Sequence, residues 1–442
     1  MDTNLATLDC TASNEQDHAL ALTHAPLIRF DAAEPFLPSA VGYTVFRTNA
    51  ESPSFPRRIE IGAGCVIEYA IWWDWDIGHL YELEHIWVHL DANGNMVDAE
   101  ASWHGGFNRM VDQNGNIPLE NGRLVVYSEP GKHAFAPSEQ RLLERRPTTL
   151  HGCTTGSGRM GVHVTRLFKG RILTRTPNNN QLAHTFLERH AFIPTYAFSK
   201  RFPLESARFT PWDNLNAWIP QRVAWWLGEL DRTIPYVERR ALHIAHLDAP
   251  AQSPEALKAA ADSGADMVKV DVRITADGQP TIVHDEESQA SDPPMTFDAL
   301  VEQCRDLGLG LYLDIKALAA PTGQHLFTTL DKYGLAHYAI WASSHADWLA
   351  DIKTARPDVF TAISFEATDL DVIALAQSAH ADYVHPCWEH QAEQPHTLLT
   401  PDWLERVRAA GLGIITWNAK RPAEIEALQQ LGVSGICSNA IT

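Results

Sequence analysis

The sequence predicts an α/β protein in which a (β/α)8 TIM barrel follows an all-β, sandwich-like domain and a helical connector. Three observations carry this prediction. From residue 241 onward, short apolar runs alternate strictly with amphipathic segments, and eight such pairs fit into about 200 residues, as in a compact barrel. Residues 26–164 instead show β-like runs between turn signals, and residues 171–240 show a helical pattern.

The N-terminal part divides into two predicted segments. Residues 1–25 are polar and aperiodic, so we expect a flexible tail there. Residues 26–170 form the predicted β domain, with strong turn signals at Asp91–Gly94 and Asp112–Gly115. Its strand-like runs are 40–48, 58–73, 83–90, 96–102 and 123–127.

The connector, residues 171–240, contains two predicted helices, 181–190 and 221–230. Its tryptophans are expected to be packing residues, because large aromatic side chains bury much area. A second role of the connector as a lid stays open. The tryptophans are Trp212, Trp218, Trp225 and Trp226.

The barrel, residues 241–442, begins with a strand over 241–245 and a second over 267–272. Further strands are predicted at 309–315, 338–342, 360–365, 382–385, 413–417 and 435–437, with helices between them. An open doubly wound sheet would show a Gly-rich phosphate loop after its first strand, and the sequence has none.

Composition excludes several classes of function. The net charge of −20 argues against sequence-independent binding of nucleic acid and against adhesion to anionic membranes. No window of about 18 apolar residues predicts a membrane span, and the N-terminus lacks the features of a signal peptide. The six cysteines are scattered, so we expect a cytoplasmic protein without a disulfide framework. The oligomeric state stays open.

Chemistry-bearing side chains follow the first barrel strands. His246 ends the first strand, Lys269 and Asp271 share one face of the second, and His284 ends a run that follows a D-G turn. In a parallel α/β fold the carboxyl ends of the strands are where ligands bind.

The order H…G-A-D-M-V-K-V-D-V…T-A-D-G-Q-P-T-I-V-H-D resembles the glycerophosphodiester phosphodiesterase family. Similar motifs continue at 311–316, 413–418 and 432–439, so that the resemblance covers about 200 residues. It implies a hydrolase of lipid metabolism that acts on a glycerophosphodiester or a related small phosphodiester. His246 and His284 would be its general acid and base.

The family's metal-binding pattern is altered. The resemblance implies Glu-x-Asp on the second strand and Glu on the third, whereas this chain has Lys269, Asp271 and Asp314. Leu247 stands in place of an Arg, and Ala251 in place of a Glu. A calcium or magnesium ion at Asp271 and Asp314 stays an option, although the charge of Lys269 opposes it.

Two interpretations follow. In the first, Lys269 replaces the metal and, with Lys316, stabilises the phosphoryl oxygens without an ion. In the second, the barrel is inactive or repurposed as a ligand-binding or scaffold protein, and Lys269 fills an old metal site. Trp417 matches a family position near the pocket and would contact substrate, or it packs in the barrel core.

A second candidate site lies in the β domain, where acids and imidazoles are dense between residues 74 and 85 and recur at 102–105 and 131–133. This density suits a divalent metal with mixed oxygen and nitrogen ligands. The segment resembles the D…G-H-x-x-D-W-E motif of necrosis-inducing proteins and of the vacuolar-sorting protein 62 family, with E-L-E-H in place of D-W-E. The candidate ligands are Asp76, His79, Glu82, Glu84, His85 and His104.

The alternative for these residues is that the acids are solvated and the histidines structural. A third function therefore stays open, in which the chemistry occurs at a metal in the β domain beside Glu84 or His85.

Overall fold

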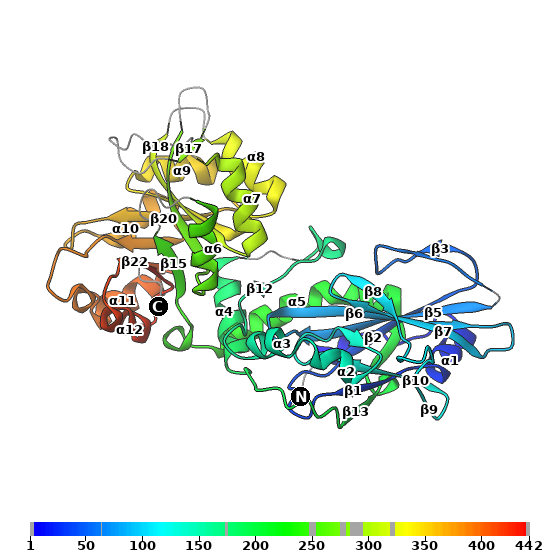
Figure 1. The fold of residues 1–442 in the computed structure, drawn as a ribbon. Helices are drawn as coiled ribbons and strands as arrows, with labels where there is room; N and C mark the ends of the chain where they lie inside the picture. The colour runs from blue at the N-terminus through cyan, green and yellow to red at the C-terminus, as the bar shows by residue number, and fades with distance from the viewer. Residues whose placement is uncertain are drawn as a thin grey trace. The chain divides into compact units, whose positions relative to one another are not determined.

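The computed structural model describes residues 4–62, 64–172, 176–246, 253–274, 280–282, 295–318 and 323–438. The chain forms two compact units (Figure 1). The first consists of Met1–Thr174 and Ala183–Arg232, and the second of Arg175–Leu182 and Thr233–Thr442. No helix in the described ranges is long and apolar enough to cross a membrane.

The first unit contains two main sheets. One has the order β14-β2-β5-β6-β7-β8 with β12 beside β6, and the other has the order β11-β10-β1-β13 with β9 beside β10. The strands of the first sheet are β2 (Ala40–Phe46), β5 (Cys65–Trp75), β6 (His79–Leu90), β7 (Met96–Trp103), β8 (Gly106–Arg109), β12 (Gly161–Val162) and β14 (Arg208–Pro211). Those of the second are β1 (Leu27–Phe30), β9 (Leu119–Glu120), β10 (Arg123–Ser128), β11 (Phe135–Ala136) and β13 (Lys200–Pro203). A separate ribbon joins β3 (Ala50–Glu51) to β4 (Arg58–Ile59).

The two sheets share one apolar core. Alternate residues of β5, among them Ile67, Tyr69 and Ile71, pack in one cluster with Ile28 of β1 and Val126 of β10. Such alternation is expected when one face of a strand is buried against a facing sheet. The unit is sandwich-like, but it is not all-β, because α1 (Glu15–Thr23), α2 (Glu139–Leu143), α3 (Arg146–Cys153) and α5 (Trp212–Thr233) belong to the same unit.

The N-terminal segment differs from the predicted flexible tail. Asn14 caps α1 by accepting hydrogen bonds from the backbone N–H groups of Gln16 and Asp17. Ala21 is fully buried, and its carbonyl accepts a 2.7 Å hydrogen bond from the Tyr69 hydroxyl. The expectation of a tail is therefore wrong for most of this segment, because tertiary contacts fix a helix that has almost no amphipathic signal.

The predicted helical connector also differs. It contains α4 (Pro177–Glu188) and α5, but β13 pairs with β1 and β14 pairs with β2. Most of the segment therefore belongs to the first unit, and its two strands extend the two sheets of that unit. Trp212 and Trp218 are buried, as expected of packing residues.

The second unit is the predicted barrel, which the structure confirms. Eight parallel strands of the described chain close through the pairings of β15 with both β16 and β23, and β17 adds an antiparallel hairpin to β16. The strands are β15 (Leu242–His246), β16 (Met267–Ile274), β17 (Pro280–Ile282), β18 (Gly310–Leu318), β19 (Ala339–Ser343), β20 (Phe360–Phe365), β21 (Tyr383–Pro386), β22 (Gly413–Asn418) and β23 (Gly435–Ser438).

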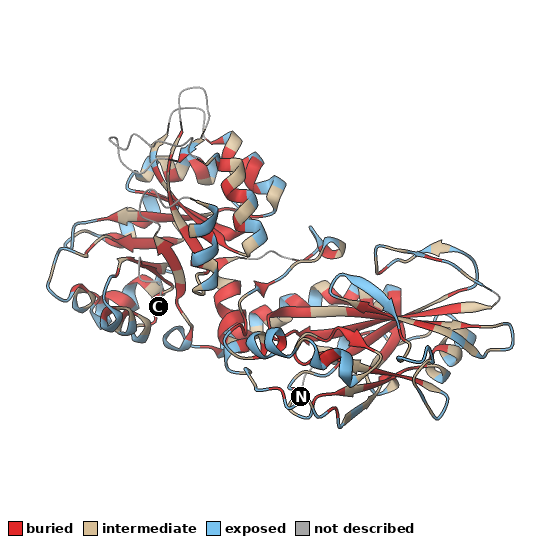
Figure 2. Ribbon diagram, viewed as in Figure 1, coloured by how far each residue is buried: buried red, intermediate tan, exposed pale blue. Residues whose placement is uncertain are grey.

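Helices surround these strands, and Figure 2 shows buried strands next to helices with exposed outer faces. Local signals set the helix ends: the side chain of Thr296 caps α7, and Gly308 ends it with a φ of 75°. The barrel helices are α6 (Pro254–Asp262), α7 (Phe297–Leu307), α8 (Gln324–Tyr333), α9 (Ala346–Ala355), α10 (Val372–Ser378), α11 (Pro401–Ala409) and α12 (Pro422–Gln430).

Candidate functional sites

A cluster of four charged side chains lies on β16 and β18. Backbone register places Asp271 of β16 directly beside Asp314 of β18. The Lys269 Nζ atom lies 3.0 Å from Asp314 Oδ2 and 3.8 Å from Asp271 Oδ1. The Lys316 Nζ atom lies 2.8 Å from Asp314 Oδ2 and 3.9 Å from Asp271 Oδ2. Two ammonium groups thus face two carboxylates.

Electrostatics keep Lys269 charged. Burial alone would lower the pKa of Lys269, but the carboxylates of Asp314 and Asp271 raise it above its ordinary value. Burial also raises the pKa of Asp271, and the two lysines oppose that rise only in part. For Asp314 the effect of burial is outweighed by Lys269 and Lys316, so the pKa of this carboxyl is lowered.

The residues of this cluster do not fit a divalent metal ion. The ammonium of Lys269 stands within 4 Å of both carboxylates that would ligate the ion. A second positive charge between them would be repelled, and each carboxylate already has a cationic partner. The predicted metal ligands Asp271 and Asp314 are therefore partners of lysine.

His246 lies at the carboxyl end of β15, and Lys269 is its partner in the register with β16. The Asn418 side chain, at the end of β22, places its Nδ2 atom 3.1 Å from His246 Nδ1. The second predicted histidine, His284, lies outside the described residues, as do Leu247 and Ala251. Asn418 was missed in the sequence analysis, although its place at the end of a strand was a usable signal.

Trp417 does not face this cluster. Its indole is 1% exposed, and its Nε1 atom donates a 3.0 Å hydrogen bond to Glu424 of α12. The indole lies beside Trp388, with 6.4 Å between the ring centroids. Of the two roles considered for Trp417, packing describes these contacts and substrate contact does not.

A buried polar pair lies near the charged cluster. The hydroxyl of Tyr312 on β18 forms a short hydrogen bond to Nδ1 of His385 on β21. Burial lowers the pKa of His385 to about 3, and the charges of Lys269 and Lys316 act in the same direction. This neutral histidine is the last residue of the predicted strand 382–385, a position like that of His246, but the sequence analysis did not single it out.

In the first unit, Asp76, His79 and Glu82 form a compact group around the start of β6. One potential ligand atom from each residue lies within 4.8 Å of the other two. The His79 Nε2 atom lies 3.9 Å from Asp76 Oδ1 and 3.8 Å from Glu82 Oε2. The carbonyl oxygen of Tyr81 lies 2.8 Å from His79 Nδ1, which makes Nδ1 the donor and leaves the Nε2 lone pair facing the two carboxylates.

The protonation states of this group suit a cation. Burial lowers the pKa of His79 to about 3, so its imidazole is neutral at ordinary pH. Burial raises the pKa of Glu82 well above its ordinary value, and the neighbouring charges of Glu84 and Asp76 raise it further. Asp76 Oδ2 is buried and accepts no hydrogen bond within the part of the chain that the structure describes. A divalent ion would satisfy that oxygen and relieve the crowding of carboxylates.

Lys132 contributes a further charge to this group. Its Nζ atom lies 2.6 Å from Asp76 Oδ1. That contact leaves the second oxygen of Asp76 for another partner. The G-K-H run at 131–133 was noted in the sequence, but Lys132 was not named as a site residue.

The other predicted ligands in this unit have separate partners. Glu84 accepts a short hydrogen bond from Ser102, and burial raises its pKa to about 8. Both ring nitrogens of His85 are buried; its Nε2 lies 3.0 Å from Ser54 Oγ and its ring stacks on Trp87. The Nε2 atom of His104 lies 2.6 Å from a carboxylate oxygen of Glu129. The group of three thus excludes Glu84, His85 and His104.

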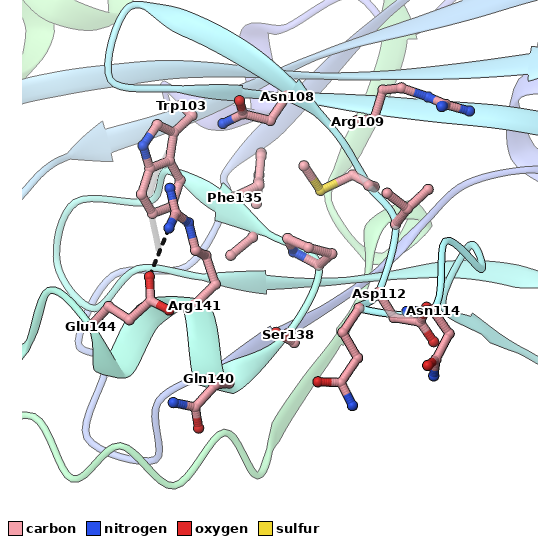
Figure 3. A pocket seen from close by; sticks show the side chains of 15 residues that line it. Trp103, Asn108, Arg109, Asp112, Asn114, Phe135, Ser138, Gln140, Arg141 and Glu144 are labelled. Carbon is pink, nitrogen blue, oxygen red and sulfur yellow. Dashed lines mark hydrogen bonds and ion pairs between the residues drawn. The ribbon is translucent and has the colours of Figure 1, made fainter.

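A cavity of about 590 Å³ opens elsewhere in the first unit (Figure 3). Trp103, Asn108, Ser138 and Arg141 are among its lining residues, and Arg141 is paired with Glu144 at 2.7 Å. None of the predicted catalytic or metal-binding residues in the described ranges lines it.

The fold and the charged cluster together define a (β/α)8 barrel with a mixed cationic and anionic site on its first strands. In sequence, this barrel is similar to the Glycerophosphoryl diester phosphodiesterase family, whose model matches residues 247–291. The "Glycerophosphodiester phosphodiesterase" of Caldanaerobacter subterraneus subsp. tengcongensis is 22% identical over 237 residues, which cover 45% of this chain and 94% of that protein. The predicted resemblance is thereby confirmed for the barrel.

Solved structures of that kind match this chain at low identity. A glycerophosphodiester phosphodiesterase from Parabacteroides distasonis is 17% identical with a TM-score of 0.38, and the alignment covers 45% of this chain and 93% of that one. A phosphodiesterase from Oleispira antarctica, solved in complex with the product sn-glycerol-3-phosphate, is also 17% identical, with a TM-score of 0.37 and coverage of 45% and 93%. The corresponding enzyme from Agrobacterium tumefaciens is 18% identical, with a TM-score of 0.37 and coverage of 46% and 97%.

Proposed function

We propose that the barrel hydrolyses a small phosphodiester of the glycerophosphodiester class and binds its phosphate through lysine side chains in place of a metal ion. The observation that carries the proposal is the place of the Lys269 ammonium, 3.0 Å from Asp314 and 3.8 Å from Asp271. Sequence similarity to glycerophosphodiester phosphodiesterases supports the substrate class.

In the proposed reaction a water oxygen bonds to phosphorus while the bond from phosphorus to the leaving alcohol oxygen breaks. The products are an alcohol and a phosphomonoester. His246 and His284 would divide the proton transfers, one taking the proton of the water and the other supplying a proton to the alcohol. Lys269 and Lys316 would stabilise the charge on the non-bridging phosphoryl oxygens.

Hydrolysis of glycerophosphocholine in the presence of EDTA tests this proposal. We expect turnover that survives chelation and that falls about 10²–10⁴-fold in His246→Ala, as for loss of a general acid or base. Lys269→Met should lose activity, whereas Lys258→Met, at an exposed ion pair on α6, should keep it. Ligand-dependent thermal stabilisation without turnover would instead support the ligand-binding alternative.

We also propose that Asp76, His79 and Glu82 hold a divalent cation in the first unit. Two observations support this second site: the ligand atoms of the three residues lie close together, and the buried Oδ2 atom of Asp76 accepts no hydrogen bond from a described residue. A bound ion would supply Lewis acidity or simply crosslink β6 to the residues that precede it. If hydrolysis were lost in Asp76→Asn and kept in His246→Ala, the chemistry would belong to this unit instead of the barrel.

A further inference from the structure

A β-bulge near the end of β22 changes the direction of the side chain of Asn418, the last residue of that strand. Thr416 of β22 pairs with Ile436 of β23, but Asn418, not Trp417, pairs with the next residue, Cys437. Trp417 is the extra residue of this bulge, and its indole reaches Glu424 on the outer helix. Bulges of this kind often turn one side chain toward a functional site. Here the side chain so placed is Asn418.

The amide of Asn418 has one hydrogen-bond partner in the described chain, namely the ring of His246. Its Nδ2 atom lies 3.1 Å from His246 Nδ1. Its Oδ1 atom is buried and accepts no hydrogen bond from any residue that the structure describes. Among the described residues, the contact with His246 is therefore the one hydrogen bond that accounts for an amide at position 418.

The contact has a consequence for the imidazole. An amide N–H group can only donate, and a neutral imidazole has one nitrogen that accepts. In this orientation of the amide, Asn418 donates to Nδ1, and the ring proton of neutral His246 is then on Nε2. An Nε2–H group is a hydrogen-bond donor for an oxygen of the substrate, and it has no lone pair with which to take a proton from water.

We propose that Asn418 is a positioning residue that holds His246 in the Nε2–H tautomer and so places it on the donor side of the reaction. Nε2–H then donates a hydrogen bond to a phosphoryl or leaving-group oxygen, and the proton of the nucleophile goes to another group. The proposal rests on the proposed function of the barrel for its catalytic meaning, but the tautomer itself is a property of the free protein.

The tautomer is measured directly by long-range ¹H–¹⁵N correlation spectra of protein labelled at histidine, with His246→Gln used to assign the His246 signals. The wild-type protein should show protonated Nε2 and unprotonated Nδ1. Asn418→Asp replaces the donor by a carboxylate, which accepts from Nδ1–H, so the signals should change to protonated Nδ1. Asn108→Asp, the same change at an exposed position of β8, should leave them as in the wild type.

An Nδ1–H signal in the wild-type protein, or unchanged signals in Asn418→Asp, would overturn the proposal. With glycerophosphocholine as the probe, Asn418→Asp should lower kcat about 10²–10³-fold and leave KM within a few-fold. Asn418→Gln, which keeps the donor, should recover part of that loss. If the wild-type protein shows no hydrolysis, the proposed function fails, and the spectra still decide the role of Asn418.

Discussion

Replacing Lys269 by methionine removes the ammonium that stands between two carboxylates and keeps an apolar side chain of similar length. Removing one partner of a buried ion pair costs about 3–5 kcal/mol, because the other charge stays buried. Lys316 remains 2.8 Å from Asp314, and the side chains of Asp271 and Asp314 are 19% and 13% exposed. We therefore expect a smaller loss in the free energy of unfolding, about 2–3 kcal/mol at pH 8.

The loss should depend on pH in a defined direction. Burial already raises the pKa of Asp271, and without Lys269 it should rise further. A carboxyl whose pKa is higher in the folded than in the unfolded protein lowers stability as pH rises from the unfolded value, about 3.9, through the folded one. The deficit of Lys269→Met relative to wild type should therefore be smaller at pH 5 than at pH 8.

Urea unfolding of both proteins at the two pH values, followed by circular dichroism, measures this deficit. Lys258→Met is the control, because the Lys258 and Asp262 side chains are about two-thirds exposed and such pairs contribute little. A variant as stable as wild type at pH 8, or equally destabilised at both pH values, would refute the assignment of Lys269 as the partner of the two carboxylates.

Three further predictions follow from other contacts. Lys269→Glu supplies a third carboxylate beside Asp271, so the variant barrel should bind Mg²⁺ or Ca²⁺ in calorimetric titrations. The wild-type barrel should show no such binding. An unchanged titration would mean that the geometry, and not the charge of Lys269, excludes the ion. Elemental analysis should find a divalent metal that is lost in Asp76→Asn and kept in Asp271→Asn, and the reverse pattern would place the ion in the barrel. Arg222→Leu should destabilise the first unit by about 3–5 kcal/mol in urea unfolding. The reason is that Arg222 and Asp74 form two buried hydrogen bonds, of 2.7 and 2.8 Å. A loss of stability below about 1 kcal/mol would contradict this prediction.

The barrel was predictable because its signal is local. Each strand and the helix that follows it are contiguous in sequence, and the apolar runs have the length of buried strands. The first unit lacks this property, since β13 and β14 join β1 and β2 from more than 150 positions away along the chain. No local periodicity could reveal that the supposed connector completes two sheets.

The candidate sites were predictable only as far as strand alternation holds. Lys269 and Asp271 were expected to share one face, and both contact the same cluster. Glu82 and Glu84 are two positions apart in a regularly paired part of β6 and their charges interact, but only Glu82 belongs to the group with Asp76. Tyr81, between His79 and Glu82, has a φ of 58°, a backbone conformation that is irregular for a strand. Trp417 was considered as a residue near the pocket, but the bulge in β22 places Asn418 beside His246 instead. Such one-residue irregularities leave no signature in the pattern of residue types.

In the proposed function, the charges of the barrel cluster take the place of a metal ion in binding phosphate. The pattern of the resembling family has three carboxylates, a divalent ion and the lysine of the third strand, and these charges sum to zero. Here Lys269 replaces one carboxylate, and the set of Lys269, Asp271, Asp314 and Lys316 also sums to zero. A change from Glu to Lys raises the local charge by two, which equals the charge of a divalent ion. In the proposed function a phosphodiester would therefore meet the same net charge, with the positive charge fixed by covalent attachment to β16 instead of by ligation. This equivalence requires that Lys269 stay protonated in the folded protein, which is the state that Asp314 and Asp271 enforce by raising its pKa.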